Sequence, residues 1–199
     1  AYFLALLNEK RMDEFEPAFQ KILDSGREMT PMQKVFYSTY LLEKRDPSST
    51  IRINEAIAAI KSHMGNRDNN VIASMSVASG MLYYLYVDKA ISLATLDGDV
   101  KGALDASLEA DQWKSSKASL DYKALWSRLA YYYILQDQQA AGLLYEKIKT
   151  ATSIDGQNLV HSYLDIYYKY CMGFGVKSEA ACEKKALSSL AEIGEYSKG

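Results

Sequence analysis

Proline, histidine and cysteine are scarce in this sequence, which holds three, two and two of them among 199 residues. With few prolines and few runs of valine and threonine, little of the chain is suited to β-sheet, and long helices are favoured. Acidic and basic residues are interspersed, and the net charge is only −2. A protein that binds duplex nucleic acid usually carries a basic patch, because neutralising phosphates supplies much of its affinity. We therefore expect an all-α protein with no nucleic-acid partner.

Motifs of catalysis and metal binding are also missing. The sequence has no glycine-rich phosphate loop, no zinc-ligand spacing and no nucleophile-elbow motif. Its two histidines, His63 and His161, stand far apart, and neither has a neighbourhood rich in metal-ligand residues. Solvated helix faces explain the acidic residues, and no carboxylate pair stands out as catalytic. We expect no metal, no cofactor and no enzymatic activity, and an enzyme is kept as a third hypothesis.

Charge is absent from Asn69 to Val87, so a membrane span has to be considered. Serines, asparagines and tyrosines make this segment too polar to favour insertion, and Asp88 and Lys89 follow it directly. A helix buried on most sides within a stack of helices explains the composition better. This helix is expected to run from Asn70 to about Leu96, with a bend near Gly80. We expect no transmembrane segment in this chain.

The clearest local pattern runs from Ser119 to Thr150. Apolar residues recur at helical spacing on both sides of a polar turn, Gln136 to Gln139, which predicts two helices folded back on each other. Similar hairpins recur along the chain. The sequence therefore predicts a single helical-repeat domain over residues 1–199, with antiparallel helix pairs at about residues 1–26, 30–65, 70–113, 116–151 and 155–198.

Two helix starts carry capping patterns. Asp13 is followed three residues later by Glu16, which is typical of a capping box. Thr30 offers a second N-cap hydroxyl, with Pro31 at the first helical position and Gln33 placed to return a hydrogen bond. We expect helices to begin at Asp13 and Thr30.

Small residues recur in the second helix of each predicted pair, at intervals of 38 to 47 residues: Ala18, Ala56, Ala103, Ala141 and Ala180. The clearest pair reads Trp126-x-x-Leu129-Ala130-x-x-Tyr133, followed by Ala141-x-x-x-Tyr145. This pattern resembles the tetratricopeptide-repeat family, in which small residues lie where helices cross and large rings fill the space between hairpins. The resemblance implies a right-handed α-solenoid of about five helix pairs, and it indicates no particular member of the family.

The family resemblance also implies a binding face. In tetratricopeptide repeats the first helix of each pair lines a concave groove. The register set by Trp126 places the following candidate binding residues on that face: Asp88, Ser92, Ala124, Ser127, Tyr131, Ile134, His161 and Tyr168. Packing between helices is the alternative role for these positions. The chain's 16 tyrosines suit either role, because the ring is apolar and its tip is polar.

Cys171 and Cys182 flank the last predicted turn, where an antiparallel hairpin would bring them together. They form either a disulfide or two buried thiols that act as small apolar residues. A disulfide would indicate an exported protein, for example a periplasmic one, whereas a cytoplasmic protein would keep the thiols reduced. The sequence leaves the compartment open between cytoplasm and periplasm.

These features favour a non-catalytic module that binds a protein or peptide partner, as an adaptor, a scaffold or a chaperone-like component. The alternative is an extracytoplasmic helical component of a transport or envelope assembly, which would bind a small ligand between hairpins. A homo-oligomer is a further hypothesis, because incompletely capped solenoid ends tend to pair.

Overall fold

The computed structural model describes residues 11–65, 71–114, 121–151, 160–175 and 178–197. Within these residues every regular element is helical and no strand occurs, which confirms the all-α prediction. The helices are α2 (Met12–Asp24), α3 (Pro31–Glu43), α4 (Ser49–Gly65), α5 (Val71–Ser92), the π-helical η1 (Leu93–Asp97), α6 (Val100–Trp113), α7 (Tyr122–Ile134), α8 (Gln138–Ala151), α10 (Val160–Phe174) and α11 (Glu179–Tyr196). No helix in these ranges is long and apolar enough to cross a membrane.

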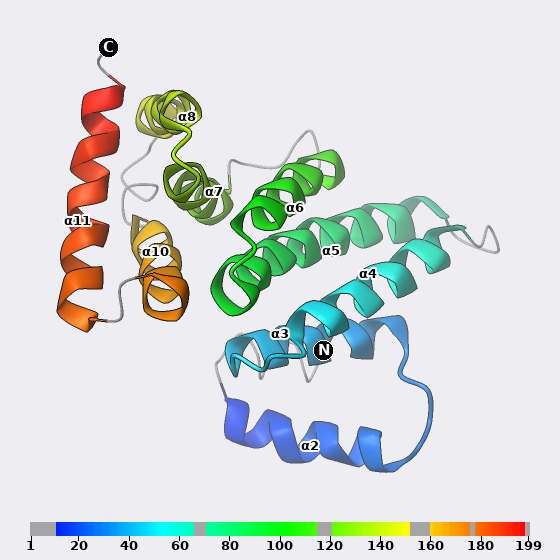
Figure 1. Ribbon diagram of the computed structural model, residues 1–199. Helices are drawn as coiled ribbons and strands as arrows, with labels where there is room; N and C mark the ends of the chain where they lie inside the picture. The colour runs from blue at the N-terminus through cyan, green and yellow to red at the C-terminus, as the bar shows by residue number, and fades with distance from the viewer. Residues whose placement is uncertain (1–10, 66–70, 115–120, 152–159, 176–177, 198–199) are drawn as a thin grey trace. The chain divides into compact units, whose positions relative to one another are not determined.

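The chain divides into two compact units. The first comprises Ala1–Lys89 with Trp113–Ser115, and the second comprises Ala90–Gln112 with Ser116–Gly199. The sequence predicts one domain over residues 1–199, and the structure divides that range near the end of α5. Helices α2 to α4 belong to the first unit, and α7 to α11 belong to the second (Figure 1). Each unit is described by itself.

Of the two predicted capping boxes, one is confirmed and one is wrong. Thr30 accepts a hydrogen bond from the backbone N–H of Gln33 at 3.3 Å, and the Gln33 side chain accepts one from the Thr30 N–H at 2.8 Å. Helix α2 instead begins one residue before Asp13, with Arg11 as N-cap and no capping bond from its side chain. Asp13 lies in the first turn, where a carboxylate interacts favourably with the positive end of the helix dipole.

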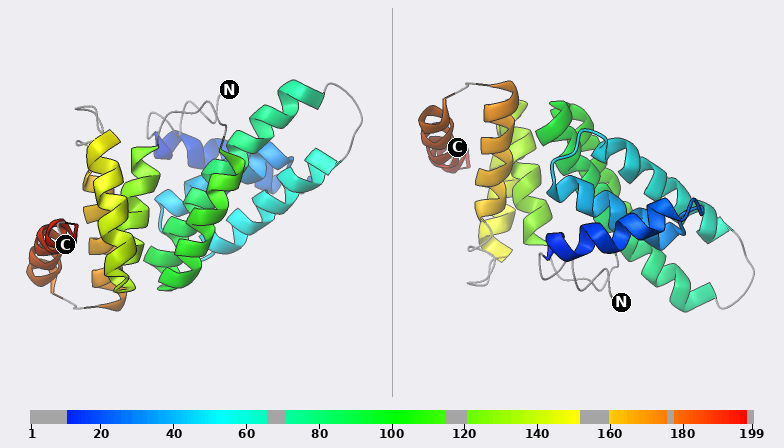
Figure 2. Two further views of the ribbon diagram at one scale, coloured as in Figure 1. Left: turned by 90° about the horizontal axis from the view of Figure 1, so that it is seen from above. Right: turned by 90° about the horizontal axis from the view of Figure 1, so that it is seen from below.

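Stacked aromatic rings form the core of the first unit. Phe15 and Phe19 of α2 are almost completely buried and lie 5.3 Å apart, centroid to centroid. The Phe15 ring stacks on Tyr40 of α3 at 4.8 Å, and the Phe19 ring stacks on Tyr37 at 5.0 Å. Helix α3 also packs along α4, and the two lie side by side in both views of Figure 2. The apolar stripe of α2 therefore packs onto α3 through its rings.

The long uncharged helix continues through Gly80 as α5 and departs from α geometry only near its end. Five residues, Leu93–Asp97, form the π-helical turn η1. Gly98 then reverses the chain with φ of +73°, a left-handed conformation that glycine adopts without steric cost. The hydrogen-bonded α-helix is continuous at Gly80, and the wider turn of η1 directly precedes the reversal of the chain.

Helix α7 is the central helix of the second unit. It contacts both α8 and α10, and α11 contacts α8 and α10 in turn. The hairpin predicted between Ser119 and Thr150 is confirmed by α7 and α8, whose turn places Gln136 at a positive φ of +60°. Every residue of α7 from Ala124 to Tyr131 is buried. Because α7 is covered on all sides, its polar residues have to find partners inside the unit.

Some of the buried polar groups in this unit meet that requirement through bonds between helices. The Arg128 guanidinium of α7 donates to the hydroxyl and the carbonyl of Ser107 on α6, at 2.9 and 2.5 Å. It also pairs with the half-exposed carboxylate of Asp111 at 2.7 Å. Between α10 and α11, the hydroxyls of Tyr163 and Ser189 lie 2.6 Å apart in a hydrogen bond. These bonds connect α6 to α7 and α10 to α11.

A disulfide also joins α10 to α11. The sulfur atoms of Cys171 and Cys182 lie 2.20 Å apart, and their Cα atoms are 5.8 Å apart. Both residues are buried. Of the two alternatives that the sequence leaves open, the structure contains the bridge.

Candidate functional site

The eight candidate binding residues do not form one groove. Ser92, Ala124, Ser127 and Tyr131 are buried, and Tyr131 has no exposed surface. A buried side chain cannot contact a partner, so these four are packing residues in this structure, and their assignment to an open groove is corrected. For the three residues on α7, the physical reason is that helices cover its supposedly open face as well as its packed face. Ser92 ends α5 and has no exposed surface.

The other four candidates are reachable but scattered. Asp88 lies in the first unit, is half-buried, and accepts a hydrogen bond from the Thr39 hydroxyl at 3.3 Å. Ile134 ends α7, His161 is exposed near the start of α10, and Tyr168 is half-buried further along α10. Only Ile134 lines the pocket described next.

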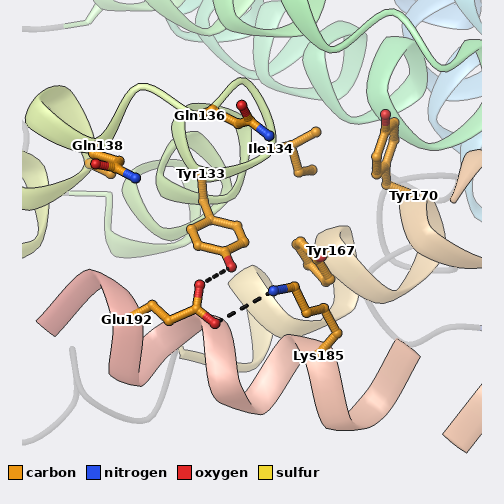
Figure 3. Close-up of a pocket in the computed structure, with 9 residues that line it drawn as sticks. Tyr133, Ile134, Gln136, Gln138, Tyr167, Tyr170, Lys185 and Glu192 are labelled. Carbon is orange, nitrogen blue, oxygen red and sulfur yellow. Dashed lines mark hydrogen bonds and ion pairs between the residues drawn. The ribbon is translucent and has the colours of Figure 1, made fainter. Parts of the chain in front are cut away.

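A pocket of about 430 Å³ opens in the second unit at the end of the α7–α8 hairpin. It is formed by the end of α7, the turn after it, the start of α8, and facing positions on α10 and α11 (Figure 3). Nine residues line it: Tyr133, Ile134, Gln136, Gln138, Ala141, Tyr167, Tyr170, Lys185 and Glu192. This volume is within the range of roughly 300 to 1,000 Å³ that small-molecule sites occupy.

One ionic cluster lies at the wall of the pocket. The Tyr133 hydroxyl donates to one oxygen of the Glu192 carboxylate at 2.5 Å, and the Lys185 ammonium lies 3.5 Å from the other (Figure 3). The hydrogen bond from Tyr133, together with the charge of Lys185, lowers the pKa of the Glu192 carboxyl, although burial acts in the opposite direction. Glu192 is therefore ionised at neutral pH, and its charge is balanced by Lys185.

Tyrosine rings form the apolar part of the pocket. The Tyr133 and Tyr167 rings meet edge to face with their centroids 5.7 Å apart, and Tyr163 stacks beneath Tyr167 at 6.3 Å. Burial raises the pKa of Tyr167, and the nearby carboxylate of Glu192 raises it further. Both effects keep the Tyr167 hydroxyl protonated well above neutral pH, so it remains a hydrogen-bond donor.

Several polar groups in the pocket have no hydrogen-bond partner among the described residues. They are the hydroxyls of Tyr167 and Tyr170 and the side-chain amides of Gln136 and Gln138. Each of these groups can both donate and accept a hydrogen bond. The arrangement can therefore bind a ligand that has donors, acceptors and an apolar face, and it requires no net charge from that ligand.

The sequence interpretation missed most of this pocket because it assigned its residues to other roles. Tyr133 is part of the repeat pattern, Ala141 is one of its recurring small residues, and Gln136 to Gln139 form a turn. The only signal was the high tyrosine content. No group of three or more His, Cys, Asp or Glu side chains in the described part of the chain could hold a metal ion.

Comparison of the chain with protein-family models, with curated proteins and with solved structures finds no match.

Proposed function

We propose that this protein is a non-catalytic binding module that holds a segment of a partner protein in the tyrosine-lined pocket. The observation that carries this proposal is that the hydroxyls of Tyr167 and Tyr170 and the amides of two glutamines line the pocket and have no hydrogen-bond partner among the described residues. A peptide backbone offers both a donor and an acceptor at each residue, which the amides of Gln136 and Gln138 can pair with. Tyrosine rings supply apolar contact area at low entropic cost.

The proposed architecture is a right-handed α-solenoid of about five helix pairs, similar to tetratricopeptide repeats. The contacts in the second unit support it: the first helices α7 and α10 pack together, as do the second helices α8 and α11. In such a solenoid each hairpin buries its apolar face against its neighbours. The pocket lies between two successive hairpins and not on a continuous concave groove.

A non-catalytic role is favoured by the state of Glu192. A general acid at neutral pH needs a raised pKa, whereas the hydrogen bond from Tyr133 lowers the pKa of this carboxyl. Both of its oxygens are also engaged by Tyr133 and Lys185. Glu192 is better suited to holding α7 and α11 together than to transferring protons.

A second candidate function is the binding of a small neutral ligand by an extracytoplasmic component of a transport or envelope assembly. The volume of the pocket favours it, because about 430 Å³ accommodates a small molecule. The disulfide between Cys171 and Cys182 is typical of an oxidising compartment such as the periplasm.

Affinity purification of the tagged protein from its own cells, read by mass spectrometry, tests the first proposal. We expect a stoichiometric protein partner with the unsubstituted chain, and we expect it to be lost with Tyr170→Ala and weakened with Gln138→Ala. Tyr84→Ala is the matched control, because Tyr84 is 64% exposed and lies in the first unit. A partner retained by all three variants would contradict the assignment to the pocket. Absence of a protein partner together with a bound small molecule in native mass spectrometry would favour the second candidate.

A further inference from the structure

A second hollow lies in the same unit, along the α10–α11 hairpin, and it shares no residue with the pocket of Figure 3. Its volume is about 360 Å³, and six residues line it: Leu164, Asp165, Tyr168, Glu183, Ala186 and Leu187. The first three belong to α10 and the last three to α11. We call this surface the α10–α11 groove.

The floor of the groove is apolar and open. Leu187 is 64% exposed, and Leu164 and Ala186 lie beside it in the lining. An exposed leucine in a hollow lacks the favourable free energy that covering its side chain would supply. A partner that covers Leu187 would recover part of this free energy.

The rim of the groove is acidic. Glu183 is exposed and makes no ion pair with any described residue. It stands four residues before Leu187, so both side chains lie on one face of α11. Asp165 on the opposite rim pairs with Lys169 at 2.7 Å, and the Tyr168 hydroxyl donates to Glu179 at 3.3 Å. None of the six lining residues is basic.

From this combination we propose that the α10–α11 groove binds an amphipathic helix of a partner protein, whose leucine-type residues are flanked by lysine or arginine. Helix-in-groove binding places apolar side chains at helical spacing into a hollow between two helices. A basic residue beside the partner's apolar anchor would meet Glu183, the rim carboxylate without an ion pair.

Charge argues against a second copy of this chain as the occupant. A symmetric dimer brings the same patch of both copies together. Such a contact would place Glu183 and Asp165 of one copy close to the same carboxylates of the other. Like charges in contact destabilise an interface, whereas a basic helix is complementary to it.

The test uses two synthetic helical peptides with identical leucine positions at helical spacing, one with lysine and one with glutamate at the polar positions. Fluorescence anisotropy measures their binding to the full chain at physiological salt. We expect the lysine peptide to bind and the glutamate peptide to bind at least tenfold more weakly. Equal binding of the two peptides, or no binding of the lysine peptide, would overturn the proposal.

Two variants test whether the lysine peptide binds in the groove. Glu183→Lys and Leu187→Glu are each expected to weaken binding of the lysine peptide at least tenfold, and both positions are exposed, so the fold should be retained. Asp105→Lys changes the charge by the same amount at an exposed position on α6 outside the groove, and it should have little effect. A similar loss of lysine-peptide binding with all three variants would show non-specific attraction and would contradict the proposal.

Self-association is measured in parallel by sedimentation. A dimer that Leu187→Glu dissociates would overturn the assignment of the groove to a basic partner helix. Tyr170→Ala, which alters the tyrosine-lined pocket, is expected to bind the lysine peptide normally. Failure of the pocket proposal is therefore distinguishable from failure of the groove proposal.

Discussion

Both units contain ring contacts and hydrogen bonds between helices, such as Thr39–Asp88 in the first and Tyr133–Tyr167 in the second. Among the described residues, however, the disulfide and the buried arginine belong to the second unit. In the first unit, rings of α2 and α3 stack face to face, with Phe15, Phe19, Tyr37 and Tyr40 in one cluster. In the second unit, directional bonds cross between helices: the guanidinium of Arg128, the Tyr163–Ser189 pair and a disulfide.

This difference has consequences for how each unit tolerates change. Apolar stacking depends on shape and volume, so it fails when a ring is removed. Buried polar groups depend on the presence of particular partners, so they fail when either partner is lost. The second unit also carries both candidate binding surfaces, and its directional bonds hold the helices that line them.

The largest expected effect is in the first unit. Phe15→Ala removes a ring that has no exposed surface and leaves a cavity against Tyr40, which should cost about 3 to 5 kcal/mol of unfolding free energy. Hydrogen exchange should show the loss of protection in α2 and α3. Tyr84→Ala, which removes an exposed ring, should change the protection of α2 and α3 very little. Unchanged protection in α2 after Phe15→Ala would contradict the stacked-core interpretation.

In the second unit, Arg128→Ala should cost about 2 to 3 kcal/mol, because it removes three hydrogen bonds and leaves the Ser107 carbonyl without its guanidinium. Asp111→Asn should cost less, about 1 kcal/mol, since that carboxylate is half-exposed and solvent screens the pair. Denaturant unfolding, monitored by hydrogen exchange in α6 and α7, compares the unfolding free energies of the two variants. Equal costs would show that the ion pair, and not the bonds to Ser107, dominates.

Removing the disulfide should have an effect of similar size to Arg128→Ala. Replacing both Cys171 and Cys182 by alanine opens a loop whose ends are 11 residues apart, which should cost about 2 to 3 kcal/mol. Thermal unfolding of the double variant checks this, and a thiol titration of the non-reduced protein provides the control. Two reactive thiols in the unfolded, non-reduced chain would show that no bridge forms.

The prediction with the smallest expected effect distinguishes the two units by the pH dependence of their stability. Burial, with a hydrogen bond to Glu16, raises the pKa of Tyr40 from 10.0 to about 12. The folded state therefore holds the proton more tightly, so this stabilisation is complete below pH 10 and is lost as the pH rises towards 12. Tyr40→Phe should reduce the loss of hydrogen-exchange protection that α3 shows at alkaline pH.

Burial also raises the pKa of Tyr163 in the second unit, so α10 and α11 should keep their alkaline sensitivity in the Tyr40→Phe variant. Hydrogen-exchange protection compared at neutral pH and near pH 11 measures both regions in one sample. If Tyr40→Phe reduced the alkaline loss of protection equally in α3 and α10, the two tyrosines would not report on separate units.

Local signals in the sequence predicted local structure well. The Thr30 box and the α7–α8 hairpin both depend on residues close in sequence. The prediction of Asp13 as N-cap was wrong, since the N-cap is Arg11, two residues earlier. An acidic residue is favourable both at the N-cap and in the first turn, so its presence alone does not fix the start of the helix. The proximity of Cys171 and Cys182 followed from the hairpin, but their bonded state did not.

The binding residues were much less predictable. A helical pattern shows which face is apolar, but it does not show how many neighbours surround the helix. For α7 the expected open face is covered, so Ala124, Ser127 and Tyr131 pack inside the unit. The pocket combines Tyr133 with Glu192, which are far apart in sequence and meet only because α7 and α11 fold together.

Short-range patterns in the sequence were enough to predict that the described chain is helical and that α3 with α4, α7 with α8, and α10 with α11 fold back on each other. These properties depend on backbone preferences and on interactions within a few residues. The folded arrangement alone specified which tyrosines are buried, which line a pocket, and that Leu187 stays exposed beside Glu183, which has no ion pair with a described residue. Burial and complementarity depend on packing between distant segments, and residues near one another in sequence do not specify that packing.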